Sequence, residues 1–302
     1  MRFFCFIGNF DVTFRLIRLL VIIFLLILLS CTRSVTLKGS RYVVLSPEIA
    51  EILLGIGVYE EIVGITEEMV SFFEDGSPFP LPLVSGFKPV IVGNFGHVSL
   101  EAVVDLQPSI VFTSGLEQNE ITVHLSKLNI QTVQLYPRDL HDLYSVIDTL
   151  GVICDRVSEA EVLSNYLRDQ FEVFRIISEV RQNKPRVFIE IYGNPIMTAD
   201  DSSYLGQLLA LVGGVNIFPE LARDYCMVNA EDVVKLDPEV IILAYPGVTV
   251  FDIQSRKGWG DVSAVLNNRI FTVDDIDPDL ILRAGPRNVE GVVRLSELIY
   301  DM

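Results

Sequence analysis

The sequence has few of the residues that build metal sites and covalent cross-links. Its 302 residues include four cysteines and three histidines, and no two cysteines are spaced closely enough for a CxxC pair. Zinc sites made of thiols or imidazoles need such residues clustered at short intervals. We therefore expect no metal site built on thiols and no zinc-hydrolase site built on clustered histidines. We also expect Cys154 and Cys226 to remain unbridged, because they fall on opposite sides of a long predicted helix.

Basic residues and catalytic motifs are scarce as well. Lysine and arginine number 23 against 40 acidic residues, which gives a formal charge of −17. That sign repels phosphate backbones, so nucleic acid is excluded as a partner. The chain has no P-loop and no nucleophile elbow, and Gly55-Ile56-Gly57 does not extend to a dinucleotide-binding fingerprint. The sequence thus favours a binding protein over an enzyme.

The N-terminus carries an apolar run after two arginines. Leu19 to Leu29 is an uninterrupted stretch of eleven apolar residues, about half the length that a membrane-spanning helix needs. A signal peptide fits this length better. The run ends at Leu28-Leu29-Ser30-Cys31, which resembles a bacterial lipoprotein box. We expect residues 1–30 to be the signal peptide, Cys31 to be lipidated and residues 31–40 to form a tether; the alternative is an uncleaved anchor reaching back to Phe14.

Beyond the tether, short apolar runs alternate with helical periodicity, which is typical of parallel sheets covered on both faces. Ser46 is placed to cap the first helix. Residues 158–182 predict one amphipathic helix, with apolar residues every three or four positions and Pro185 beyond its end. The strand candidates are Tyr42 to Leu45, Glu61 to Ile65, Ile110 to Thr113, Thr132 to Leu135, Val187 to Ile191, Val240 to Leu243 and Ile270 to Val273.

One segment recurs 130 residues later. Residues 100–111, which read LEAVVDLQPSIV, are echoed by residues 230–241, which read AEDVVKLDPEVI. In each copy a glutamate opens a short helix, Leu-x-Pro ends it and an apolar strand follows. The echo predicts two similarly built Rossmann-like α/β lobes, residues 41–138 and 184–302, joined by a connecting helical segment, residues 139–183.

At this point the chain resembles the metal-chelate group of ABC-importer substrate-binding proteins, which carry ferric siderophores, haem and cobalamin. The resemblance implies two lobes joined by one long helix, a metal chelate as ligand and no cofactor. It also implies an ABC permease with its ATPase as partners, attachment to the membrane through the lipid anchor, and a monomer in the cell envelope on the periplasmic or extracellular face. The matching motifs are Val43-Val44-Leu45-Ser46-Pro47, Leu100-Glu101 with Leu106-x-Pro108, Lys184-Pro185-Arg186-Val187-Phe188, Gly213-Gly214-Val215-Asn216-Ile217-Phe218 and Arg283-Ala284-Gly285-Pro286-Arg287.

The resemblance also assigns site residues. Glu101 and Glu231 match the glutamates that meet basic side chains of the permease, and the internal echo independently places them at equivalent positions. Asp279 and Arg283 match a polar pair of the cobalamin binders. The remaining ligand candidates are aromatic or imidazole side chains in loops at strand ends, namely Phe87, His97, Tyr192 and Tyr225.

The ligand stays open between a ferric siderophore or other iron complex, cobalamin and haem. His97 and the tyrosines are able to coordinate iron, and Arg283 is able to face an anionic chelate. Two other readings are a surface lipoprotein of the same fold that binds a protein or another ligand, and a two-lobed Rossmann-like enzyme.

Overall fold

The computed structural model describes residues 39–73, 88–115 and 118–300. The predicted signal peptide, Cys31 and Phe87 lie outside these ranges. Residues from Arg41 onward form one compact unit. Within the described ranges, no helix combines the length and the apolar character that crossing a bilayer requires.

The first lobe is built on a five-stranded parallel sheet in the order β3-β2-β1-β6-β7. Its central strand β1 is buried along its whole length, since helices cover both faces. A short antiparallel hairpin, β4 with β5, follows β3. The strands are β1 (Tyr42–Val44), β2 (Ile62–Ile65), β3 (Val90–Ile91), β4 (Gly93–Asn94), β5 (His97–Val98), β6 (Ile110–Thr113) and β7 (Thr132–Gln134).

The first helix of this lobe begins as predicted. The Ser46 hydroxyl accepts a hydrogen bond from the Ile49 amide, and Pro47 occupies the first turn, where its missing N–H costs nothing. The lobe contains α2 (Pro47–Gly55), the 3-10 helix η1 (Glu67–Phe73), α3 (Leu100–Asp105), α4 (Asn119–Lys127) and α5 (Leu140–Ile153).

The second lobe combines two sheets. A parallel sheet has the order β11-β8-β13-β14, and a three-stranded antiparallel sheet has the order β12-β10-β9. The strands are β8 (Arg186–Glu190), β9 (Tyr192–Gly193), β10 (Ile196–Ala199), β11 (Val215–Asn216), β12 (Tyr225–Met227), β13 (Val240–Leu243) and β14 (Ile270–Phe271). The helices are α7 (Tyr204–Leu211), α8 (Ala230–Leu236), α9 (Val250–Gln254), α10 (Ser263–Leu266), α11 (Asp279–Leu282) and α12 (Asn288–Tyr300).

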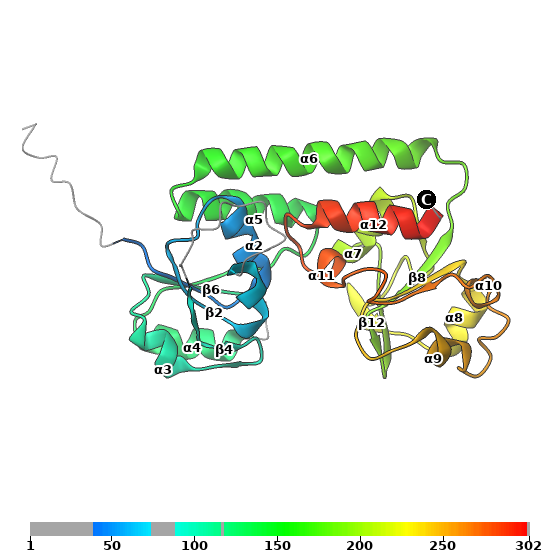
Figure 1. Cartoon of the computed structure of the whole chain (residues 1–302), viewed down its shortest axis with the longest axis horizontal. Coiled ribbons are helices and arrows are strands. Elements are labelled where there is room, and N and C mark those ends of the chain that lie inside the picture. The colour runs from blue at the N-terminus through cyan, green and yellow to red at the C-terminus, as the bar shows by residue number, and fades with distance from the viewer. Residues whose placement is uncertain (1–38, 74–87, 116–117, 301–302) are drawn as a thin grey trace, which may run out of the picture. The chain divides into compact units, whose positions relative to one another are not determined.

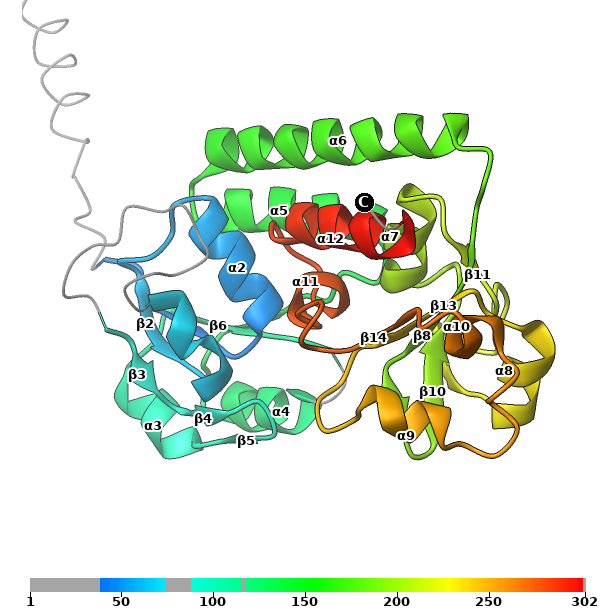
Figure 2. The same cartoon turned by 45° about the vertical axis from the view of Figure 1, so that its right-hand side comes forward.

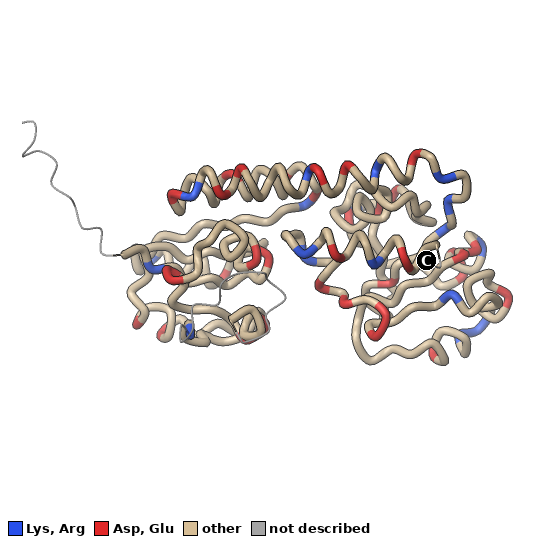
Figure 3. Tube along the Cα trace, turned by 45° about the horizontal axis from the view of Figure 1, so that its top comes forward, with Lys and Arg blue, Asp and Glu red and all other residues tan. Residues whose placement is uncertain are grey.

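One long helix joins the lobes. Helix α6 (Val157–Val180) lies within two residues of the predicted bounds at each end. Its inner face buries Ala160, Leu167 and Phe171, and it packs on α5 of the first lobe and on α7 and α12 of the second (Figures 1 and 2). Charges of both signs line its length (Figure 3). The predicted architecture of two α/β lobes and one connecting helix is therefore confirmed, while the exact lobe boundaries stay predictions.

The internal echo is also visible in three dimensions. Helix α3 leads into β6 and helix α8 leads into β13, and each helix buries the equivalent valine, Val103 or Val233, completely. Each helix is followed by a residue with positive φ, Gln107 at 47° and Asp237 at 45°, directly before the proline of Leu-x-Pro. The same backbone device thus turns the chain into the strand in both lobes.

Candidate ligand-binding site

Ligands of parallel α/β folds bind beyond the carboxyl ends of the strands. In the first lobe, η1 begins two residues after β2 and carries Glu68, whose carboxylate accepts a hydrogen bond of 2.9 Å from the Phe95 amide in the β4–β5 turn. In the second lobe, Tyr192 follows β8 and Tyr245 follows β13. These carboxyl edges are where we place the candidate ligand-binding site.

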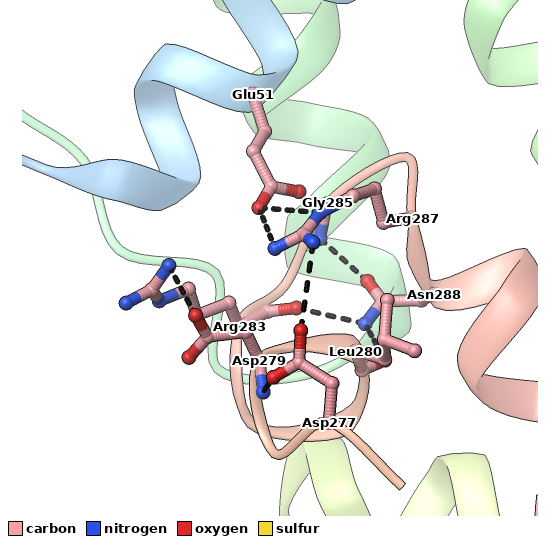
Figure 4. Close-up of polar contacts among 8 residues, drawn as sticks. All are labelled: Glu51, Asp277, Asp279, Leu280, Arg283, Gly285, Arg287 and Asn288. Carbon is pink, nitrogen blue, oxygen red and sulfur yellow. Dashed lines mark hydrogen bonds and ion pairs between the residues drawn. The ribbon is translucent and has the colours of Figure 1, made fainter. Parts of the chain in front are cut away.

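A polar cluster at the start of α12 connects the two lobes. We call it the Arg287 cluster, and Figure 4 shows its members: Glu51 from α2, with Asp277, Asp279, Arg283, Arg287 and Asn288 from the C-terminal segment. Arg287 donates from Nε and Nη2 to Glu51 Oε1 at 3.1 and 2.9 Å. The side chains of Glu51 and Arg287 are 1% and 11% exposed, so this ion pair between the lobes is almost completely shielded from solvent.

Two of the predicted ligand contacts meet in this cluster. Arg283 Nη1 lies 2.7 Å from Asp279 Oδ2, one helical turn away along the chain. Burial raises the pKa of Asp279, and the charge of Arg283 opposes this effect. The structure therefore brings Asp279 and Arg283 together as a partly exposed pair, with the Arg283 side chain 21% exposed.

Arg283 faces the first lobe. Burial alone would raise the pKa of Glu68, but the bond from the Phe95 amide, aided by the positive charge of Arg283, holds that pKa below its ordinary value. The charge of Arg283 also acts on Glu51. Both acids belong to the first lobe, so the positive charge of Arg283 acts across the boundary between the lobes.

A second polar network supports two tyrosines of the second lobe. Glu190, at the end of β8, is fully buried and receives a bidentate pair of bonds from Arg256 at 2.5 and 2.6 Å. The Tyr245 hydroxyl donates to the same carboxylate at 2.5 Å. The Tyr245 ring lies 6.3 Å from that of Tyr192, which is 52% exposed. Tyr192 and Tyr245 together offer an aromatic surface, in which Tyr245 is fixed by its bond to Glu190.

The other predicted ligand residues lie apart from these groups. His97 is exposed on β5 and lines a surface cavity of about 270 Å³ with His124 and Glu120 of α4. Tyr225 is half-buried on β12 and bonds to the backbone of Leu205, and burial raises the pKa of its hydroxyl. The ligand roles of His97 and Tyr225 stay predictions, as does that of Phe87, which lies outside the described residues.

The predicted docking glutamates occupy matching places. Glu101 in the first turn of α3 and Glu231 in the first turn of α8 are both exposed. Within the described ranges, no group of three or more histidine, cysteine or acidic side chains is arranged to hold a metal ion. The two glutamates keep their docking role as a prediction.

Several residues of these networks were not among the sequence candidates, and the central ones are Glu51, Glu190, Arg256 and Arg287. Glu51 could have been suspected, because it lies in a helix that is apolar on almost every side, and an acid there must be buried. Arg287 belongs to the motif that begins at Arg283. Glu190 and Arg256 carry no sequence signal, since 66 residues separate them.

Comparisons with known proteins agree with this geometry. A family model described as periplasmic binding protein matches residues 43–276. The "Uncharacterized ABC transporter substrate-binding lipoprotein YvrC" of Bacillus subtilis is 26% identical over 89% of this chain and 83% of its own length. A "Vitamin B12-binding protein" of Vibrio parahaemolyticus is 23% identical over 85% of this chain and 88% of its own.

Among solved structures, a possible iron-binding, periplasmic solute-binding protein from Staphylococcus epidermidis superimposes with a TM-score of 0.73. It is 23% identical and covers 87% of this chain and 99% of its own. At that identity the likeness shows a shared fold.

Proposed function

Because the chain belongs to the periplasmic binding protein family, we propose that it is the substrate-binding lipoprotein of an ABC importer and that its cargo is a metal chelate. The observation that carries the proposal is the Arg283–Asp279 pair, which the Glu51–Arg287 contact holds against the opposite lobe. A ligand bound there touches both lobes, as a carrier requires.

The aromatic surface indicates which chemical class of ligand the protein carries. Tyr192 and Tyr245 present rings on which a flat or bulky chelate can pack. Arg283 supplies a positive charge toward a carboxylate or another anionic group of the ligand. A ferric siderophore or another iron complex is our first choice, and cobalamin or haem comes next. A vitamin B12-binding relative supports a metal chelate as the class of ligand.

Delivery is assigned to the two exposed glutamates. Glu101 and Glu231 stand at equivalent positions of the two lobes, so a permease with basic side chains at two matching sites would meet one from each lobe. Exposed ion pairs contribute only about 0.2 to 1 kcal/mol each. Docking is therefore specific and reversible, which suits a carrier that must leave after unloading.

The membrane attachment is assigned to Cys31. Each buried acyl methylene adds about 0.8 kcal/mol, so several chains hold a protein whose net charge the membrane surface repels. We expect Cys31→Ser to move the protein into the soluble fraction. Retention of this variant on the membrane with its first thirty residues uncleaved would contradict the anchor.

The ligand assignment is tested by calorimetric titration of the mature protein with a ferric hydroxamate, a ferric catecholate, cyanocobalamin and haem. We expect at least one to bind with micromolar or tighter affinity, and Arg283→Gln to weaken it at least tenfold. Arg175→Gln is the matched control, because Arg175 lies on α6 and pairs there with Glu172. Failure of all four chelates to bind would contradict the proposed cargo.

A further inference from the structure

The loop that presents Arg283 rests on a side chain of the other lobe. Gly285 packs so closely on Glu51 that a Cβ at position 285 would lie 2.6 Å from Glu51 Oε2. Arg287 covers the other carboxylate oxygen. The segment Gly285–Asn288 is thus the lid that keeps water from this carboxylate, and any opening of the segment exposes Glu51.

Asn288 makes the segment rigid. Its Nδ2 donates to the carbonyl oxygens of Leu280 and Arg283 at 2.8 and 2.7 Å. Its Oδ1 accepts from the Gly285 amide and the Tyr204 hydroxyl at 2.5 and 2.7 Å. Because Asn288 bonds both to Gly285 and to the backbone of Arg283, a movement at the Glu51 contact displaces Arg283.

We propose that Glu51 is a positioning residue that holds the ligand-facing Arg283 in place from the opposite lobe, and that it does so more firmly when its carboxyl group is protonated. This inference deepens the proposed function, since the ligand role of Arg283 rests on that function.

The sign of the proton effect follows from what surrounds the carboxyl group. Among the described residues, Glu51 is faced by Arg287, Arg283, Asp279 and the Tyr204 hydroxyl, and Arg287 is also 3.8 Å from Asp277. Burial is the largest influence and raises the pKa of Glu51 from 4.5 to about 7, although Arg287 opposes it. Opening the segment removes the burial and returns the pKa toward 4.5, so protons favour the closed segment.

This linkage predicts a measurable change. With a pKa of about 7 when closed and 4.5 when open, closure becomes about tenfold more favourable between pH 8 and pH 6. Hydrogen exchange of the peptide covering residues 279–288 measures closure, because the Gly285 amide is bonded inside it. After correction for intrinsic exchange rates, we expect its protection to rise about tenfold at the lower pH.

Two variants separate the carboxyl group from general stability. Glu51→Gln imitates the protonated form, so its protection is expected to be the same at both pH values and to exceed that of the unaltered protein even at pH 6. Arg287→Met removes the cation that opposes the rise, so its pH response should move to more alkaline values. Glu61→Gln is the control, because it breaks an ion pair of the same lobe, with Arg156 at 3.1 Å, away from this segment.

Ligand binding provides a second readout. A chelate from the panel that binds is expected to bind several-fold more tightly at pH 6 than at pH 8, and Glu51→Gln should remove that difference. If no chelate binds, the proposed cargo fails while the exchange experiment still decides this inference. Equal pH responses of Glu51→Gln and the unaltered protein, or lower protection at pH 6 than at pH 8, would overturn it.

Discussion

At the amino edges of the two sheets, an arginine makes similar contacts in each lobe, although in the second lobe the carbonyl that Nε bonds lies one position later in the repeat. Arg41 Nε donates to the Leu106 carbonyl at 3.0 Å, and Arg186 Nε donates to the Asp237 carbonyl at 2.9 Å. The backbone oxygen of each arginine accepts a bond from the residue after the proline of Leu-x-Pro, Ser109 or Glu239. Each arginine thereby ties the end of α3 or α8 to the start of a central strand.

At the carboxyl edges the lobes differ. The first lobe continues from β2 into η1 and a hairpin, whereas the second continues from β8 into an antiparallel sheet that carries Tyr192. The buried glutamates of the two lobes differ too. Glu51 of the first lobe lies under a loop of the second lobe, whereas Glu190 of the second lobe pairs with Arg256 of the same lobe. The repeated part of the chain builds the framework and carries the two predicted docking glutamates, and the divergent part carries the proposed ligand contacts.

The largest expected effect is on uptake, and it tests the two glutamates of the repeated segments. Charge reversal at both docking positions, Glu101→Lys with Glu231→Lys, should nearly stop uptake, while either single reversal should only weaken it. Chelate affinity should stay the same, because both residues are exposed on short helices apart from the Arg287 cluster.

Uptake by whole cells and calorimetric titration of the purified double variant decide the matter together. Exposed Glu161→Lys on α6 serves as a control for the added positive charge. Loss of chelate binding in the double variant would place these residues in the site or the fold, and normal uptake would mean that docking uses another surface.

An intermediate effect contrasts the two buried glutamates. Glu190→Gln leaves the Arg256 charge without its partner, so we expect the free energy of unfolding to fall by about 3 kcal/mol. Glu51→Gln at pH 8 should raise it by about 1 to 2 kcal/mol, since the ionised carboxyl group is costly to bury there and Arg287 keeps Asp277, 3.8 Å away, as a second anionic partner. Denaturant unfolding followed by circular dichroism measures both.

The pH dependence of the free energy of unfolding shows in which direction Glu51 acts. The pKa of Glu51 is higher in the folded chain, about 7, than its ordinary 4.5. Its contribution to stability is therefore complete below pH 4.5 and is lost as the pH rises through 7. The advantage of Glu51→Gln should thus shrink between pH 8 and pH 6, and an advantage that grew on acidification would contradict the assignment.

The smallest expected effect distinguishes two residues that have the same backbone conformation in the two lobes. Gln107 and Asp237 share a positive φ, in which a side chain is unfavourable. Gln107→Gly should stabilise the chain by about 0.5 kcal/mol, because strain relief exceeds the entropy that glycine adds to the unfolded state. Asp237→Gly should destabilise it by about 1 to 2 kcal/mol, since its carboxylate bonds the Ser263 amide and hydroxyl at 2.7 and 2.8 Å.

Thermal unfolding of the two glycine variants compares them directly. A shift in the same direction for both would mean that backbone strain, rather than the side-chain bonds of Asp237, decides the outcome in the second lobe.

The framework was predictable from the sequence because it depends on local patterns. Apolar runs located β6, β7, β8 and β13 to within a residue, and helical periodicity located α6. The antiparallel sheet of β9, β10 and β12 was not foreseen, since its strands are two to four residues long and interrupted near Gly193 and Pro195.

The site was predictable only in part. Asp279 and Arg283 are one helical turn apart, so spacing alone suggests that they meet. Glu51 and Arg287 are 236 positions apart, and their pairing exists only once the two lobes are packed. Pattern reasoning sees contacts along one helix or strand and cannot see those that tertiary packing creates.

The single tryptophan lies wholly in one lobe, and this has an optical consequence. Trp259 is fully buried, packs 6.2 Å from the Phe188 ring, and has the Arg256 guanidinium 4.6 Å above its own ring. Arg256 in turn bonds Glu190, which holds Tyr245. Three successive contacts thus connect the indole of Trp259 to Tyr245. We therefore expect the tryptophan emission of this protein to respond to changes around Tyr245 in the second lobe and not to changes in the first lobe.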